Sequence, residues 1–152
     1  SGTLPTQQIA GMGSAYALAA QEMQADGARI AALRDLLWDL LATLTGVERN
    51  GDAQRCVPGI LNVAIDGVEG ESLLAALPDL AVSSGSACAS MTGEPSYVLR
   101  ALGRSDRLAQ SSLRLSLGRF TTRGDIERAA QRIREEVLRL RSLSPDPASA
   151  GG

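Results

Sequence analysis

Apolar residues recur at helical spacing along the first third of the chain. They form two stripes, the first made of Ile9, Met12, Tyr16, Ala19 and Met23 and the second of Leu33, Leu36, Leu37, Leu40, Leu41 and Leu44. The second stripe has the i, i+3, i+4, i+7 pattern of an amphipathic helix, which we expect to end at Gly46. Because Gly27 lies between the stripes, the pattern fits either two helices or one long bent helix.

The middle of the chain alternates short apolar runs with turn residues. This pattern predicts a strand at 60–65, a short helix at 69–77 that ends at Pro78, a short buried strand at 80–82 and a short helix at 96–102. Residues 83–95 show no periodicity and are rich in Ser, Gly and Ala, which predicts an exposed loop.

The last third of the chain predicts one strand and one helix. Leu113, Leu115 and Leu117 alternate with Arg114 and Ser116, as in a strand with one apolar face. The next residues are typical of a helix start, with Thr121 and Thr122 at the cap and Asp125 in the first turn. Helical spacing then continues through Ile126, Ala129, Ile133, Val137 and Leu140.

These elements predict an α/β chain whose main part is a small α+β domain. We expect a helical arm and a small mixed or antiparallel sheet with helices packed on it. The domain should occupy residues 26–144, after an N-terminal segment at 1–25. The residues at 145–152 are rich in Pro, Ala, Gly and Ser and should form a disordered tail.

Composition narrows the chemistry of which this chain is capable. The chain has 152 residues and a net charge of −2; all fifteen residues counted as Lys+Arg are arginine, and histidine is absent. No lysine is therefore present to bind pyridoxal phosphate or to complete a P-loop, and no imidazole to act as a base or a zinc ligand. The near-neutral charge favours neither nucleic acid nor an anionic membrane as a partner.

Two cysteines are too few for a disulfide scaffold, and they lack the spacing of a metal site. No apolar run is long enough to span a membrane, and we expect a cytoplasmic protein with free thiols. The chain starts at Ser1 without a methionine, as expected of a piece of a longer protein.

Cys88 is the strongest candidate for chemistry. It lies among small residues in the segment 83–90, which would leave its sulfur accessible and allow the backbone to approach a ligand. A thiolate nucleophile needs a nearby cation or helix N-terminus, and in this chain only arginine or backbone N–H groups could provide it. The alternative is a small buried side chain without a chemical role, as most free cysteines are.

Arg114 is the second candidate. Strand alternation directs it away from Leu113 and Leu115, beside Ser112 and Ser116, where a guanidinium could bind a carboxylate through two hydrogen bonds. The alternative, an ordinary surface arginine, is the more common situation. We interpret Cys56, just ahead of the first predicted strand, as incidental.

Several motifs in fixed order resemble the C-terminal portion of cysteine desulfurases of the IscS/NifS type. They are Ser1-Gly2-Thr3, Asn62 with its strand, and the segments 68–73, 79–88, 94–103 and 111–122, and the resemblance extends from Ser1 to about Pro145. It implies the class V aminotransferase fold of fold-type I pyridoxal-phosphate enzymes, a homodimer, and conversion of L-cysteine to L-alanine with sulfur held as a persulfide. The sulfur would pass to an iron–sulfur scaffold protein or a sulfur-carrier protein.

The resemblance also implies roles for three residues. Cys88 matches the persulfide-forming nucleophile, Arg114 matches the arginine that binds the substrate carboxylate, and Thr3 matches a threonine that reaches the cofactor phosphate of the other subunit. The cofactor lysine would belong to a large domain upstream of residues 1–25, so the isolated chain should be inactive. The alternatives are a non-enzymatic persulfide carrier or an interaction domain in which Cys88 only packs.

Overall fold

The structure, a computed structural model, describes residues 2–83 and 94–143. In chain order its elements are α1 (Thr6–Leu41), β1 (Val47–Arg49), β2 (Ile60–Ile65), α2 (Gly70–Ala75), α3 (Tyr97–Ala101), α4 (Asp106–Gln110), β3 (Ser112–Ser116) and α5 (Arg123–Leu143). Cys88 and the predicted tail at 145–152 lie outside the described residues, as does most of the predicted loop at 83–95.

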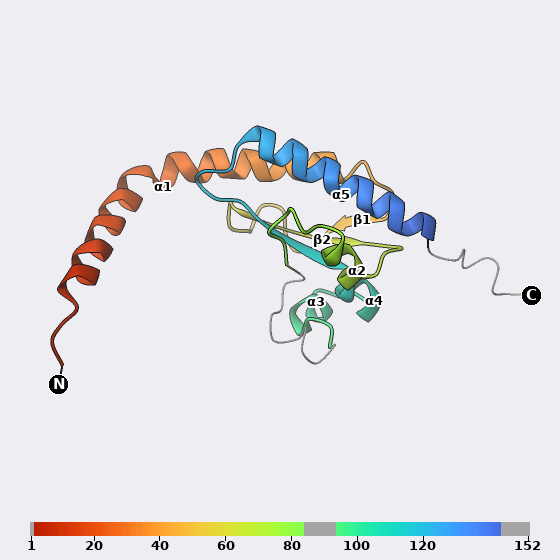
Figure 1. The fold of residues 1–152 in the computed structure, drawn as a ribbon, viewed down its shortest axis with the longest axis horizontal. Helices are drawn as coiled ribbons and strands as arrows, with labels where there is room; N and C mark the ends of the chain where they lie inside the picture. The colour runs from red at the N-terminus through yellow and green to blue at the C-terminus, as the bar shows by residue number, and fades with distance from the viewer. Residues whose placement is uncertain (1, 84–93, 144–152) are drawn as a thin grey trace, which may run out of the picture.

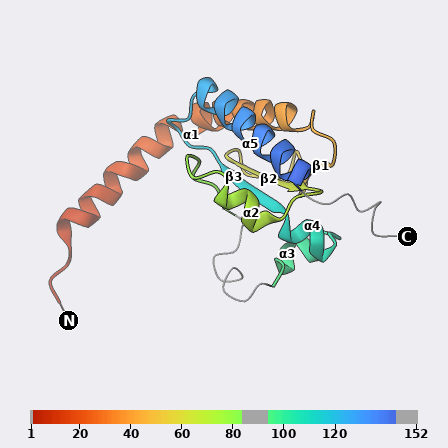
Figure 2. The same ribbon diagram turned by 45° about the vertical axis from the view of Figure 1, so that its right-hand side comes forward.

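The two N-terminal stripes belong to one helix, so Gly27 does not interrupt α1. The C-terminal half of α1 lies side by side with α5 over one face of the sheet (Figures 1 and 2). The N-terminal half projects beyond the sheet, and residues 6–21 are exposed on every side. This half includes large exposed apolar side chains at Ile9, Met12 and Tyr16.

The sheet is antiparallel, with strand order β1-β2-β3. Its register pairs Val63 with Leu113 and Leu61 with Leu115. These residues face α1 and α5, where they form the core with fully buried residues such as Leu37, Leu41, Ile133 and Val137. The short helices α3 and α4 lie on the other side of the sheet (Figures 1 and 2). The predicted class of a small sheet with helices packed on it is therefore confirmed.

The predicted strand at 80–82 is wrong. The N–H of Leu80 donates to the carbonyl of Leu77, and the N–H of Val82 donates to that of Leu80, so local turns occupy these groups. Only Ser83 pairs with the sheet, as an isolated bridge to Arg114. The structure also contains β1 and α4, which have three and five residues and were not predicted from the sequence.

The long helix α5 begins where the threonines predicted it. The Thr122 hydroxyl accepts a hydrogen bond from the Asp125 N–H, and the Asp125 carboxylate accepts one from the Thr122 N–H. This reciprocal pair is a capping box, which satisfies backbone donors at the start of the helix. Among the described residues, no helix is long and apolar enough to cross a membrane.

Candidate functional site

The sheet face that is turned away from α1 and α5 is polar at its centre. Strand alternation brings Asn62, Ser112 and Arg114 to this face, and Asn62 is the cross-strand partner of Arg114. Arg114 is exposed, Asn62 is half-buried and Ser112 is buried. The sequence prediction that Arg114 points away from the leucines of its strand is therefore correct.

The main chain of Arg114 is fixed on its outer edge by Ser83. The Arg114 N–H donates to the Ser83 carbonyl at 2.7 Å, and the Ser83 N–H donates to the Arg114 carbonyl at 3.3 Å. Ser83 is five residues before Cys88 in the sequence. One end of the segment that carries Cys88 is thus attached directly to the strand residue that carries the candidate carboxylate-binding side chain.

A hydrogen-bonded network covers the polar face beside Arg114. The Asn50 amide nitrogen donates to the Asn62 side-chain oxygen at 2.7 Å and to the Ser112 hydroxyl at 3.0 Å. The Ser112 hydroxyl donates in turn to the Leu108 carbonyl at 2.7 Å. Arg104 completes the network, since its Nε donates to the Asn50 side-chain oxygen at 2.6 Å.

Arg104, which lies between α3 and α4, also joins this part of the chain to strand β1 of the sheet. Its Nη2 donates to the Arg49 carbonyl at 2.8 Å, and its Nη1 forms an ion pair with Glu48. This network was not predicted from the sequence, because its members are far apart in the chain. The one local signal was the polar residue Asn62 inside an otherwise apolar strand.

A second arginine, Arg100, joins the two short helices α3 and α4 to each other. Arg100 of α3 binds Asp106 of α4 through two hydrogen bonds of 2.7 and 2.9 Å. The hydrogen bonds from Arg100 hold the pKa of the Asp106 carboxyl below its ordinary value. The helices that follow the Cys88 segment are therefore joined to each other and, through Arg104, to the sheet.

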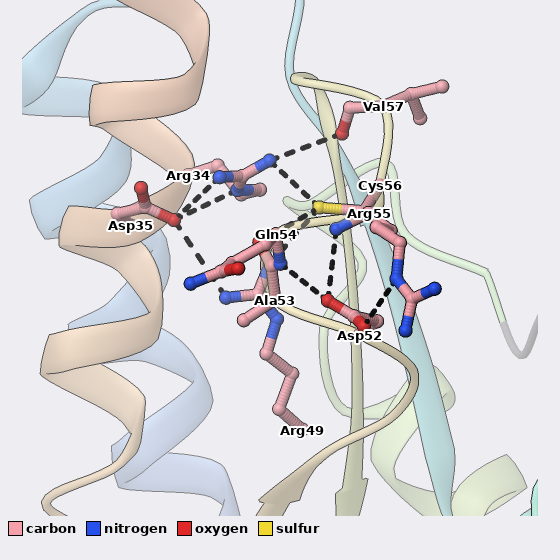
Figure 3. Close-up of polar contacts among 9 residues, drawn as sticks. All are labelled: Arg34, Asp35, Arg49, Asp52, Ala53, Gln54, Arg55, Cys56 and Val57. Atoms are coloured by element: carbon pink, nitrogen blue, oxygen red, sulfur yellow. Dashed lines mark hydrogen bonds and ion pairs between the residues drawn. The ribbon is translucent and has the colours of Figure 1, made fainter.

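Cys56 lies in a different place, where the connection between β1 and β2 meets α1 (Figure 3). Its sulfur accepts hydrogen bonds from Arg34 at 3.1 Å and from Arg49 at 3.5 Å. The thiol donates to the Ala53 carbonyl at 3.3 Å. Arg34, which is buried, also pairs with Asp35.

These contacts hold the connection between β1 and β2 against α1. The Asp52 carboxylate accepts hydrogen bonds from the N–H groups of Gln54 and Arg55, and the Arg55 N–H is the main cause of a lowered Asp52 pKa. Among the residues that the structure describes, the Cys56 side chain bonds within this loop and to its neighbours on α1 and β1, and these contacts are those of a structural residue.

Thr3 is exposed in the irregular segment ahead of α1. This N-terminal segment lies far from the sheet in both views (Figures 1 and 2), so the described part of the chain does not bring Thr3 to Arg114. Within the described residues, no group of three or more His, Cys, Asp or Glu side chains could hold a metal ion.

The residues of this chain do not by themselves fit pyridoxal phosphate. The chain contains no lysine that could hold the cofactor covalently, and Thr3 is a single exposed hydroxyl. What the polar face offers is a guanidinium beside an oriented amide, an arrangement that can bind an anion such as a carboxylate.

The family model for class-V aminotransferases matches residues 1–129. The chain belongs to this family. Cysteine desulfurase IscS of Aeromonas hydrophila is 58% identical over 145 residues, which are 95% of this chain, and IscS of an Enterobacter species is 57% identical over the same length. The chain spans about 36% of the length of these curated relatives.

Solved structures of class-V aminotransferase relatives support the same assignment. A NifS-like protein covers 92% of this chain with a TM-score of 0.75 and 25% identity, and the chain corresponds to 36% of its length. A NifS-like protein from Rickettsia africae covers 90% with a TM-score of 0.74 and 27% identity, again with 36% of its own length matched. The family resemblance and the fold class expected from the sequence are confirmed.

Proposed function

We propose that this chain is the C-terminal part of a cysteine desulfurase, which converts L-cysteine to L-alanine and holds the sulfur as a persulfide on Cys88. The observation that carries the proposal is the 58% identity, over 95% of the chain, to a protein named cysteine desulfurase IscS. The exposed Arg114 on a polar sheet face and its backbone pairing with Ser83 support it.

In this proposal Arg114 binds and orients the substrate carboxylate. A guanidinium presents parallel N–H donors that match the two oxygens of a carboxylate, and a β-strand holds it in a fixed place. Correct placement of a substrate is itself a large part of catalysis. Arg114 therefore decides which sulfur-containing molecules are presented to Cys88.

Cys88 is the proposed nucleophile. Its thiolate attacks the sulfur of the substrate, an S–S bond forms and the Cβ–S bond breaks. The electron pair of the broken bond goes to the substrate carbon, which takes up a proton and becomes the methyl group of L-alanine. A thiolate on an acceptor, proposed to be an iron–sulfur scaffold or sulfur-carrier protein, then attacks the persulfide, as in thiol–disulfide exchange.

Pyridoxal phosphate is the proposed cofactor of the whole protein, with its lysine outside this chain. When bound, it would supply an electron sink for the substrate, which would make the Cβ–S bond labile. We propose that Thr3 donates a hydrogen bond to the cofactor phosphate of the other subunit of a homodimer. The proposed compartment is the cytoplasm.

The proposed domain division is a linking segment at 1–25, a small domain at 26–144 and a C-terminal tail at 145–152. The exposure of residues 6–21 supports the first boundary. Exposed Ile9, Met12 and Tyr16 need cover that the described part of this chain does not provide, as expected where a helix leads into another domain.

The proposal is tested in the whole protein by measuring L-alanine and sulfide produced from L-cysteine. Cys88→Ser should abolish sulfide release to a reducing thiol, because serine cannot form a persulfide. Cys56→Ser is the matched control, and it should retain activity because the contacts of Cys56 are structural. Full activity of Cys88→Ser would show that Cys88 is not the nucleophile, and equal loss in both variants would remove the support that the Cys88 variant gives to the proposal.

A further inference from the structure

We propose that Asn62 is a second hydrogen-bond donor for the substrate carboxylate beside Arg114, and that Asn50 and Arg104 fix the orientation of its amide. This inference rests on the proposed function, because it concerns the carboxylate that Arg114 is proposed to bind. It adds one binding residue and two positioning residues to the site.

The strand pairing places the Asn62 and Arg114 side chains next to each other. The Asn62 carbonyl accepts from the Asn50 N–H on the β1 side, whereas the Arg114 main chain bonds to Ser83 on the opposite side. The two residues are therefore a non-hydrogen-bonded antiparallel pair, the kind in which opposite side chains are closest. Their Cβ atoms are expected about 4.5–5.5 Å apart on one face.

The orientation of the Asn50 amide follows from Arg104. A guanidinium carries only donors, so the Asn50 atom that lies 2.6 Å from Arg104 Nε must be the side-chain oxygen. The Asn50 amide nitrogen then faces Asn62 and Ser112. Ser112 can accept this bond because its own proton is donated to the Leu108 carbonyl.

The Asn62 amide is oriented by the same sequence of bonds. Because the Asn50 nitrogen donates to it, Asn62 presents its oxygen to Asn50 at 2.7 Å. Its own amide nitrogen donates to no acceptor among the described residues, and the side chain is only half-buried. An oriented pair of N–H donors thus remains available on the face that carries Arg114.

A carboxylate is the ligand that this combination selects. Its two oxygens have about four acceptor sites, of which a bidentate guanidinium uses two. The Asn62 nitrogen can occupy another, without adding a second full charge. A ligand that lacks the carboxylate cannot accept hydrogen bonds from the Arg114 guanidinium and the Asn62 nitrogen together, so the pair of donors favours a carboxylate over such a ligand.

The test uses the cofactor-loaded whole protein and two variants that change the donor in different ways. Asn62→Leu has a similar shape and no donors. Asn50→Asp keeps an acceptor for Arg104 but cannot donate to Asn62, so the Asn62 amide should turn its nitrogen inward and its oxygen toward the ligand. The measurements are the dissociation constant of L-alanine by titration calorimetry, the KM and kcat for L-cysteine, and the thermal unfolding temperature.

Both variants should weaken L-alanine binding and raise the KM by about tenfold or more, with kcat nearly unchanged, because a hydrogen bond to a charged group contributes mainly to binding here. Ser116→Ala, on the same face two residues after Arg114, should bind like the parent protein. Unaltered L-alanine binding in either folded variant, or equal weakening in Ser116→Ala, would overturn the inference. If Asn62→Leu does not fold, Asn50→Asp decides alone.

Arg114→Gln separates this inference from the proposed function. If Arg114→Gln weakens L-alanine binding while both asparagine variants bind normally, the inference about Asn62 fails and the role of Arg114 stands. If Arg114→Gln binds L-alanine normally, the carboxylate site itself is wrong, and with it both proposals about this face.

Discussion

Gly70, at the start of α2, is required by a close approach between two backbone segments. A Cβ atom at this position would fall inside the contact distance of the Gln110 carbonyl oxygen, at the end of α4. A backbone oxygen cannot move aside as a flexible side chain can. Alanine at position 70 should therefore force α2 and α4 apart.

We predict that Gly70→Ala lowers the free energy of unfolding of the chain by about 1–3 kcal/mol, the usual cost of overpacking. Gly13→Ala is the control, since Gly13 lies in the exposed N-terminal half of α1 with nothing within 4 Å of the added Cβ. There alanine should be neutral or stabilising, because it is the better helix former. Urea unfolding of both variants checks the contrast, and a stable Gly70→Ala would disprove the close approach.

Glu69 caps the N-terminus of α2 with its carboxylate, which accepts bonds from the N–H groups of Glu71 and Ser72. The hydrogen bonds from Ser72 are the main cause that holds the pKa of Glu69 below its ordinary value of 4.5. A carboxyl whose pKa is depressed by folding stabilises the fold above its unfolded pKa and loses that contribution as the pH falls.

We predict that the parent chain is more stable than Glu69→Gln at pH 6 and that this difference shrinks as the pH falls through and below 4.5. Urea midpoints measured against pH for both proteins provide the check. A difference that stays constant with pH would show that the charge of Glu69 does not contribute to the cap.

At the candidate site, the sequence predicted the direction in which the Arg114 side chain points but not the hydrogen bonds between side chains. The outward direction of Arg114 follows from simple alternation with Leu113 and Leu115, which needs no knowledge of the partner strand. The bonds of Asn50 to Asn62 and Ser112 depend on the register of three strands, and the bond to Arg104 depends on how α3 and α4 lie over them. No local sequence pattern predicts these hydrogen bonds between residues that are far apart in the chain.

At the scale of elements, the start of α5 is the best example of a local signal that decides a boundary. Each of Thr122 and Asp125 accepts, through its side chain, a hydrogen bond from the other's N–H group. Because the two residues are only three apart in the sequence, this helix start can be predicted without knowledge of the fold. We predict that Thr122→Ala lowers the free energy of unfolding by about 1 kcal/mol.

Thermal or urea unfolding of Thr122→Ala measures this loss. Thr45→Ala is a matched control, because Thr45 is exposed and makes no side-chain hydrogen bond among the described residues. Similar stabilities of the two variants would contradict the role assigned to the cap.

The short helices α2 and α3 were predicted from the sequence, whereas α4 and the conformation of residues 80–82 were not, for physical reasons. A one-turn helix such as α4 has no apolar periodicity to detect, although Ser105 caps it by accepting a bond from the Leu108 N–H. The apolar residues at 80–82 look like a strand, yet local turns use the N–H groups of Leu80 and Val82. Burial alone did not decide between a strand and a turn there.

At the scale of the whole molecule, the exposed N-terminal half of α1 and the lack of lysine lead to the same expectation. The isolated 152-residue chain should bind no pyridoxal phosphate covalently and should produce no L-alanine from L-cysteine, because it has no amine side chain for the cofactor. Absorbance spectra with added cofactor and an L-alanine assay check this. Desulfurase activity of the isolated chain would contradict the proposal that the cofactor lysine lies outside this chain.

The most direct test of the account is the mass of the Cys88 peptide after the whole, cofactor-loaded protein has reacted with L-cysteine in the absence of any sulfur acceptor. The account predicts one additional sulfur atom on Cys88, which a reducing thiol removes, and none on Cys56. Turnover to L-alanine with an unmodified Cys88, or with the sulfur on Cys56, would contradict it.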